Sequence, residues 1–224
     1  MENKTIIKRK LNIRKILISI LILFIVFFLI FILLTKKIEN IFIYNNTLLS
    51  DQEIIDISKL RNYPNYIFKT KVSIKNDLLE NKFIKSVEIK KRKFKEIHIY
   101  IEEYRPLFIN SNNSKTVMSN SDEVLLNLNL PILINEIEEQ YYIKLVEKMN
   151  LLTNEVLFKI SEIKYDPNNI DKERILLTMN DGNYVYLTLL TFEKINNYNN
   201  ILPTLEGKRG ILYLDSGNYF EILK

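Results

Sequence analysis

The sequence lacks cysteine, tryptophan and alanine altogether, and its 224 residues include one histidine, four glycines and five prolines. Without cysteine, no disulfide supports the fold and no thiol chemistry is available. The single histidine, His98, stands without a second histidine, a cysteine or a carboxylate cluster at metal-ligand spacing. The four glycines form no phosphate-binding loop. These absences argue against an enzyme, a metal site and a bound cofactor.

An excess of charge of one sign occurs in only one short segment of the sequence, residues 1–15. Residues 1–15 carry six basic residues and one acidic residue, which accounts for the whole net charge of +5. The remainder is balanced, with 26 basic and 26 acidic residues. A nucleic-acid-binding domain needs a basic face on the folded domain. Because the excess lies in the tail, we expect no nucleic-acid partner. The absence of catalytic and phosphate-binding motifs predicts no small-molecule substrate.

The one long hydrophobic run extends from Ile16 to Leu34, and Ser19 is its only polar residue. A helix of this length measures roughly 28 Å, close to the hydrocarbon thickness of a bilayer. A cleaved signal peptide would have a shorter apolar core and a small-residue cleavage site, and the chain has no alanine. The sequence therefore predicts a retained transmembrane helix at 16–35. The basic tail, 1–15, predicts a cytoplasmic N-terminus and an extracytoplasmic remainder, which is the type II topology.

Residues 38–106 predict a small module with the element order β-α-α-β-β. Ser50 and Glu53 have the spacing of a capping box, which predicts a helix start, and Thr70 or Ser73 can cap a second helix. The expected strands are 38–44, 83–89 and 97–101. Alternation in the last strand places His98 on its polar side, as a surface residue. The basic run 90–95 predicts a solvated hairpin turn, with contact to anionic lipid or wall polymer as the alternative.

The second half of the chain predicts a mostly β domain with one or two flanking helices. The clearest hairpin surrounds Asn180-Asp181-Gly182, because Asp-Gly readily adopts a type I′ turn. Helices are expected at 138–152 and from Thr191 to about Asn200. Strands are expected at 107–110, 115–119, 123–128, 159–165, 174–179, 184–189, 210–215 and 218–223, and an apolar segment, 132–134, follows Pro131. The segment 210–214 has no charge and no proline to protect it, so it fits an open sheet edge, and it fits an inward strand equally well.

Several motifs together resemble the FtsQ and DivIB family of bacterial cell-division proteins. In the first module they are the strand and turn 41–46, the helix start 49–55, and the segments 65–68, 83–87 and 102–106. In the second half they are Ser161-Glu162-Ile163, Asn180-Asp181-Gly182, 210–215 and 217–220. With the apolar helix, this resemblance covers nearly the whole chain.

The resemblance implies an α+β fold with four parts: a cytoplasmic basic tail (1–15), a transmembrane helix (16–35), a POTRA domain (38–106) and a β domain of the FtsQ/DivIB type (107–224). It implies a single-pass divisome scaffold at the division septum. The expected partners are the FtsB/DivIC protein with FtsL, and a septal peptidoglycan synthase. The resemblance places partner binding at Gly210, Ile211, Leu212, Tyr213, Leu214, Asp215, Gly217, Asn218, Tyr219 and Phe220.

Two other classes of protein remain open on the sequence alone. A membrane-anchored cell-wall enzyme would need a polar pocket with convergent titrating groups. A POTRA-containing transport or assembly factor for outer-membrane proteins would need repeated modules or a barrel. The chain shows one module and has no room for a barrel, so the scaffold interpretation is preferred.

Overall fold

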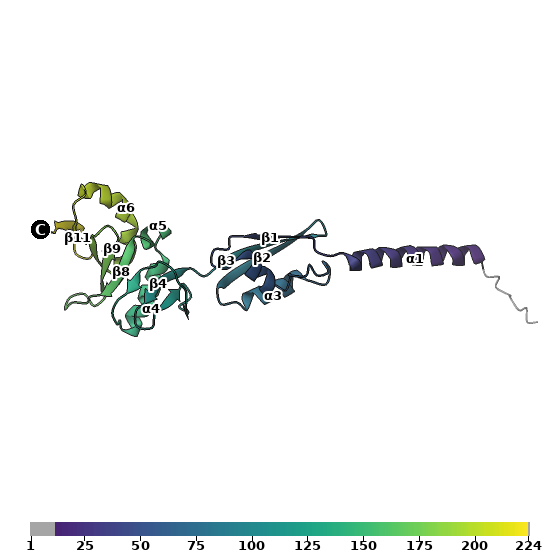
Figure 1. Cartoon of the computed structure of the whole chain (residues 1–224), viewed down its shortest axis with the longest axis horizontal. Helices are drawn as coiled ribbons and strands as arrows, with labels where there is room; N and C mark the ends of the chain where they lie inside the picture. Colours follow the sequence, from purple (N-terminus) through teal and green to yellow (C-terminus); the bar gives the residue numbers. More distant parts are fainter. Residues whose placement is uncertain (1–11, 224) are drawn as a thin grey trace, which may run out of the picture. The chain divides into compact units, whose positions relative to one another are not determined.

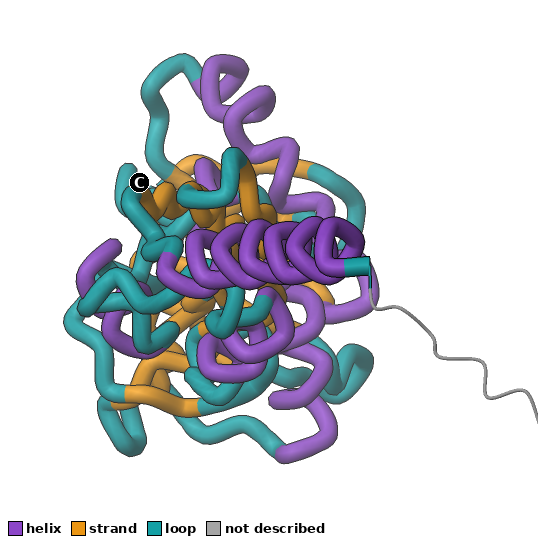
Figure 2. The backbone as a smooth tube through the Cα atoms, turned by 90° about the vertical axis from the view of Figure 1, so that its right-hand side faces the viewer, coloured by secondary structure: helices purple, strands orange, loops and turns teal. Residues whose placement is uncertain are grey.

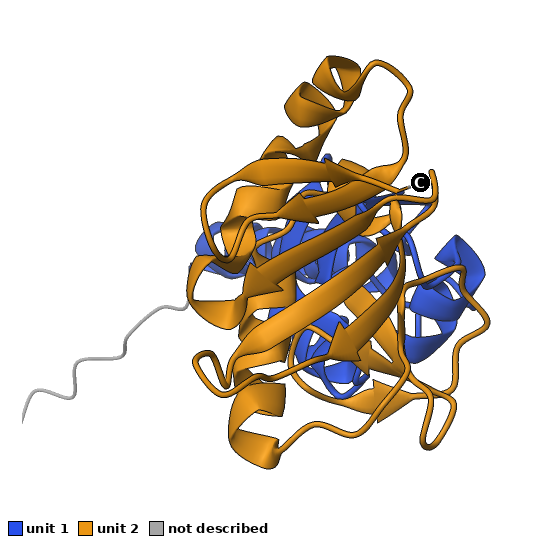
Figure 3. Ribbon diagram, turned by 90° about the vertical axis from the view of Figure 1, so that its left-hand side faces the viewer, with its two compact units in different colours: residues 1–103 blue, residues 104–224 orange. Residues whose placement is uncertain are grey.

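The computed structural model describes residues 12–223 and divides the chain into two compact units, with the division after Glu103 (Figure 3). The two compact units therefore divide three residues before the predicted domain boundary at residue 106. Arg105 donates through its backbone amide to Ser119 Oγ and through its guanidinium to the Leu152 carbonyl, which attaches it to the second unit. Most of the predicted basic tail, residues 1–11, lies outside the described residues.

The first element, α1, is one continuous helix over Ile13–Thr35 (Figures 1 and 2). It begins three residues before the predicted span, where the Asn12 side chain accepts from the Lys15 amide at 3.3 Å. None of its side chains is buried. Among residues 12–223, it is the one helix long and apolar enough to cross a membrane. Its length of roughly 34 Å matches a bilayer's hydrocarbon layer with some tilt.

The rest of the first unit has the predicted order β-α-α-β-β. The elements are β1 (Asn40–Tyr44), α2 (Asp51–Ile57), α3 (Lys71–Leu79), β2 (Ile84–Arg92) and β3 (Glu96–Glu103). Strand β3 is central, parallel to β1 and antiparallel to β2. Both predicted caps are confirmed: Ser50 and Glu53 form the reciprocal capping box, and Thr70 caps α3.

The alternation of β3 explains where the core of the first unit lies. Ile97, Ile99 and Ile101 are at most 2 % exposed and pack with the apolar sides of α2 and α3. The opposite side of the strand was predicted to be surface, and for His98 this is wrong, since only 9 % of the residue is exposed. The Phe42 ring stacks on the His98 ring at 4.7 Å, and Tyr44 Oη lies 3.2 Å from its Nδ1.

The predicted basic hairpin also contains an inward-directed lysine. Lys91 Nζ donates to the Tyr66 and Lys69 carbonyls and lies 4.2 Å from the centre of the Tyr66 ring. Burial lowers the pKa of this ammonium group, and nearby Lys71 lowers it further. Lys91 therefore joins β2 to the loop before α3, and it does not belong to the exposed turn.

The second unit contains a nine-stranded sheet, drawn in orange in Figure 3. Its strands are β4 (Pro106–Asn110), β5 (Lys115–Met118), β6 (Glu123–Val124), β7 (Ile132–Leu133), β8 (Ile160–Tyr165), β9 (Arg174–Met179), β10 (Tyr184–Thr188), β11 (Gly210–Tyr213) and β12 (Tyr219–Ile222). Their order across the sheet is β12-β11-β10-β9-β8-β7-β4-β5-β6. The expected hairpin is present as β9 and β10. Its turn is not the predicted type I′, because Gly182 has a positive φ angle but Asn180 and Asp181 do not.

Helices pack on the core side of this sheet. They are α4 (Glu139–Asn150), α5 (Asn154–Leu157), the 3₁₀ helix η1 (Leu189–Asn197), α6 (Tyr198–Ile201) and the 3₁₀ helix η2 (Leu202–Leu205). Leu145 and Met149 of α4 share one core with Phe192, Tyr198 and the inward side chains of the central strands. The prediction that Thr191 caps a regular helix is wrong, because Thr191 lies at a kink within η1.

Candidate partner-binding edge

The last strand, β12, forms one edge of the nine-stranded sheet. Strand β11 lies inside it, hydrogen bonded in parallel to β10 and in antiparallel to β12. The expectation of an open ladder at 210–214 is therefore corrected: that backbone is paired with strands on both sides from Ile211 to Tyr213. The open backbone lies one strand further along, in Tyr219–Ile222.

The register shows which groups of β12 remain available. Leu223 donates its amide to the Arg209 carbonyl at 3.1 Å, and Ile222 stands opposite Gly210. Alternate residues of an antiparallel strand direct their backbone groups to the same neighbour. Tyr219, Glu221 and Leu223 therefore face β11. The amide and carbonyl groups of Phe220 and Ile222 are directed away from the sheet, where another strand can bind them.

Side chains hold β12 in place from the core side. Phe220 pairs with Leu212, which is 4 % exposed, and packs against the core of the second unit. The Gly210 amide donates to Asn183 Oδ1 at 2.9 Å. Asn183 is buried and donates in turn to the Tyr198 hydroxyl at 3.1 Å. The turn of the β9–β10 hairpin thus fixes the start of β11, and β11 fixes β12.

The other face of the sheet carries three stacked tyrosines, which we name the tyrosine row: Tyr186, Tyr213 and Tyr219. Their ring centres are 5.5 Å and 4.5 Å apart, so the row leads from β10 directly to the free edge. The Tyr213 hydroxyl donates to Glu221 Oε2 at 3.1 Å. Burial raises the pKa of Tyr213, and so does this hydrogen bond, which keeps the phenol protonated. An apolar or aromatic side chain on an added strand would extend the row.

Arg174 packs on Tyr186, the member of the tyrosine row that lies farthest from the free edge. Its guanidinium lies 3.5 Å from the centre of the Tyr186 ring and donates to Asp215 at 2.9 Å. Asp215, predicted as a partner-binding residue, thus has a partner within the domain. Leu214 is also predicted there, but it is 3 % exposed and belongs to the core. Gly217 and Asn218 have positive φ angles and form the turn before β12.

Sequence reasoning missed four residues of this site: Arg174, Tyr186, Glu221 and Ile222. Glu221 and Ile222 could have been found, since the predicted strand 218–223 already included them. Arg174 and Tyr186 lie on other strands, so only the register reveals their contact. Within residues 12–223, the structure contains no group of three or more His, Cys, Asp or Glu residues that could hold a metal ion.

These features define a class of protein: one apolar helix, a POTRA-type module and a β domain with an open edge strand. Residues 36–104 match the family described as "POTRA domain, FtsQ-type". The chain is 32% identical to the cell division protein DivIB of Bacillus anthracis over 196 residues, covering 81% of this chain and 72% of the relative. It is 30% identical to DivIB of Bacillus subtilis, covering 83% and 74%. The chain belongs to the FtsQ/DivIB family of bacterial cell-division proteins.

Among solved structures, this chain is similar to the trans isomer of the major extracytoplasmic domain of DivIB from Geobacillus stearothermophilus. It has a TM-score of 0.40 and 21% sequence identity, and covers 47% of this chain and 96% of that chain. Family membership supports a role in cell division and interaction with other division proteins, together with a membrane anchor.

Proposed function

We propose that this chain is a scaffold of the division machinery that captures the extracytoplasmic part of the FtsB/DivIC protein, in complex with FtsL, by strand addition to β12. Through this capture it helps assemble or regulate septal peptidoglycan synthesis. The observation that carries the proposal is the unpaired outer ladder of Phe220 and Ile222. Strand addition supplies affinity through main-chain hydrogen bonds, and neighbouring side chains supply selectivity.

Apart from the shortness of β12, which has four residues, the edge lacks the usual devices that prevent pairing with another chain. Natural edge strands are protected by lysine, proline, a bulge or a covering element. Tyr219–Ile222 contains neither lysine nor proline and pairs with β11 without a register shift. Its one charge, Glu221, is held by the Tyr213 hydroxyl. An edge of this kind is suited to binding a partner strand that extends the sheet.

The proposed topology places the N-terminus in the cytoplasm and both folded units outside, at the division septum. The basic residues before the apolar helix favour this orientation. Because the chain has no cysteine, a single introduced one reports on its own environment. Ile170 is 98 % exposed. Ile170→Cys should react with a membrane-impermeant maleimide in intact cells of a Gram-positive host, and protection until lysis would contradict the topology.

The decisive variant for strand capture is Ile222→Pro in the full chain. Proline removes the outward amide of residue 222 and leaves the inward amides of Glu221 and Leu223 intact, as edge strands tolerate. Loss of a backbone hydrogen bond and the clash of the ring should weaken capture of the FtsB/DivIC–FtsL complex by roughly tenfold or more. Ile222→Ala is the matched control, because it trims the side chain and keeps the amide.

Affinities are measured with both full-length variants in nanodiscs, and amide exchange confirms that β11 and β12 remain paired. If Ile222→Pro binds the complex as tightly as Ile222→Ala with the sheet intact, strand addition at β12 is wrong. In cells, the same variant should fail to replace the unmodified protein and should leave undivided filaments.

A further inference from the structure

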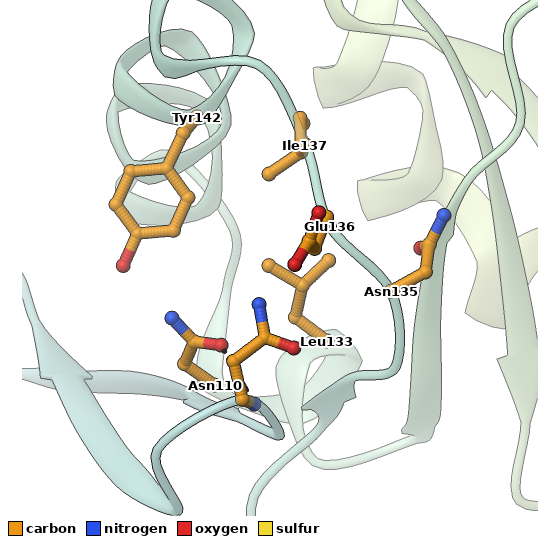
Figure 4. A pocket seen from close by; sticks show the side chains of 7 residues that line it. Asn110, Leu133, Asn135, Glu136, Ile137 and Tyr142 are labelled. Carbon is orange, nitrogen blue, oxygen red and sulfur yellow. Dashed lines mark hydrogen bonds between the residues drawn. The ribbon is translucent and has the colours of Figure 1, made fainter.

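The exposed surface close to the end of α1 differs from the polar pocket of about 250 Å³ that the second unit contains next to α4 (Figure 4). In that pocket the Tyr142 hydroxyl donates to Glu123, and none of the described side chains that line it has a buried polar atom without a hydrogen bond. In the first unit, by contrast, large apolar side chains are exposed close to the end of the membrane-spanning helix.

The loop between α2 and α3 is attached to the end of α1 by three contacts. Asn65 Nδ2 donates to the Leu34 carbonyl, and Lys37 forms a β-bridge with Asn65. The Tyr66 amide donates to the Lys36 carbonyl at 2.8 Å. Leu34 is the last residue of the apolar run. With α1 in the bilayer, this loop therefore lies at the boundary between the hydrocarbon layer and water.

The backbone of the loop is fixed from two sides. Asn65 Oδ1 accepts from the amides of Ile67 and Phe68 at 2.8 and 3.1 Å, and Lys91 of β2 donates to the Tyr66 carbonyl. Even so, Ile67 is 39% exposed and Phe68 is 68% exposed. The loop thus presents two apolar side chains to the surroundings in a fixed backbone conformation. Exposed apolar side chains that gather in one place mark an interaction site.

The turn between β2 and β3 adds a second exposed phenylalanine next to this loop. Phe94 is 66% exposed, and its ring centre lies 6.2 Å from that of Tyr66. Lys93 and Phe94 both have positive φ angles, 51° and 55°, which bulky side chains rarely adopt. Glycine or asparagine would form this turn at a lower cost in free energy. The exposed ring, and not the turn geometry, therefore accounts for a phenylalanine at this position.

Uncompensated positive charge accompanies these apolar side chains. Within residues 12–223, four exposed basic side chains form no ion pair: Lys36, Lys37, Lys71 and Arg92. The first two follow α1, the third begins α3, and the fourth precedes the β2–β3 turn. Their neighbours Lys93 and Lys95 are paired with Glu96 and Glu39. Aromatic side chains combined with an excess of lysine and arginine are typical of segments that contact a membrane surface.

We propose that the loop 65–70 and the β2–β3 turn dock the first unit onto the lipid leaflet in which α1 ends. Phe68 and Phe94 insert below the headgroups, and the four basic side chains lie on the phosphates of anionic lipids. The bilayer is favoured over another protein, because Asn65 and Tyr66 attach this surface to the end of the membrane-spanning helix. An anionic wall polymer could contact the basic groups, but it has no hydrocarbon layer to receive two rings. The docking does not use the β12 edge.

The test uses the full chain in nanodiscs. Because the sequence has no tryptophan, a single Phe→Trp substitution provides a unique fluorescent reporter. In Phe68→Trp and in Phe94→Trp, the emission should shift to shorter wavelength, and lipids brominated on their acyl chains should quench it. Phe158→Trp is the matched control, an exposed phenylalanine of the second unit, and should be quenched severalfold less. Equal quenching at all three positions would overturn the proposal.

The contribution of charge is tested in the Phe68→Trp background with Lys71→Gln and Arg92→Gln combined. In nanodiscs of phosphatidylcholine with phosphatidylglycerol, the ratio of docked to undocked protein should fall about fivefold for each charge removed. In phosphatidylcholine alone, the two substitutions should have little effect. Lys159→Gln with Lys172→Gln is the matched control, because it removes two charges from the second unit. An equal effect of Lys71→Gln with Arg92→Gln in both membranes would overturn the assignment to anionic lipid.

Two further outcomes bear on what covers the surface. Rings that stay unquenched in a first unit whose α3 amides remain protected from exchange would overturn the docking. A spectral shift that appears only when purified wall polymer is added would assign the surface to the wall and likewise overturn it. Ile222→Pro should leave the quenching unchanged, which separates this surface from strand capture.

Discussion

The Phe220 ring packs so closely on Gly210 that a methyl group added to the glycine would stand 2.5 Å from the ring's Cζ atom. The same methyl group would meet the Glu221 carbonyl, which belongs to the ladder between β11 and β12. Gly210 does not have a positive φ angle, so its role is to leave space. The position of the edge strand therefore depends on the absence of a side chain at the first residue of β11.

Gly210→Ala should displace β12 while the rest of the sheet stays folded. Overpacking of this kind costs typically about 1–3 kcal/mol, and the short edge strand is the element that can move to relieve it. Faster amide exchange at Glu221 and Leu223 is expected, with weaker capture of a partner strand. Ile211→Ala, a truncation at the neighbouring residue on the other face, is the control. If both amides in Gly210→Ala exchange as slowly as in the unmodified protein, the contact between Phe220 and Gly210 does not determine the position of β12.

Glu103 organises the loop between β1 and α2. Its carboxylate accepts from the amides of Thr47, Leu48 and Leu49 at 2.8, 2.7 and 3.0 Å, and from the Thr47 hydroxyl at 2.7 Å. Glu103→Ala should destabilise the first unit by roughly 2–4 kcal/mol, because it leaves several donors without an acceptor.

Glu102→Ala provides the comparison in the same strand. Glu102 is paired with Lys85 and Ser86, but about half of each side chain of the ion pair is exposed, so the loss of stability should be much smaller than for Glu103→Ala. Urea unfolding followed through amide signals of α2 measures both variants. Equal losses for the two substitutions would show that the loop does not depend on Glu103.

Features specified by nearby residues were predicted well from the sequence. The capping box of α2 involves Ser50 and Glu53, three residues apart, and the place of the β9–β10 hairpin, though not its turn type, followed from the Asp-Gly pair. In both cases the physical cause lies within a few residues of the chain. The apolar run of α1 is also a local property, since its length and composition alone determine whether it can span a bilayer.

Features that depend on distant segments were predicted less well. Alternation placed His98 on the polar side of β3, but whether that side is covered depends on Phe42 and Tyr44 from β1. Similarly, the neutral composition of 210–214 fits both an edge and an interior strand, and only the pairing with β12 decides between them.

Asp77 connects α3 to two lysines and should make the stability of the first unit depend on pH. It lies 2.6 Å from Lys59 Nζ and 2.7 Å from Lys69 Nζ, and its side chain is 13% exposed. Hydrogen bonds from Lys59 and from Lys69 lower the pKa of Asp77. The folded chain therefore binds this proton more weakly than the unfolded chain. The ionised Asp77 contributes its full stabilisation of the first unit above the pKa of the unfolded chain, at about pH 4. This stabilisation is lost as the pH falls through the lower pKa of the folded chain.

Asp77→Asn should consequently cost roughly 1–3 kcal/mol at pH 7 and less near pH 3, where the unfolded chain of the unmodified protein already binds the proton at Asp77. Urea unfolding at both pH values, followed through amide signals of α3, measures this difference. Asp56→Asn removes a more exposed pair with Arg61 and should change stability by less than about 1 kcal/mol at pH 7. A loss for Asp77→Asn that is the same at both pH values would mean that the two lysines do not depress the Asp77 pKa.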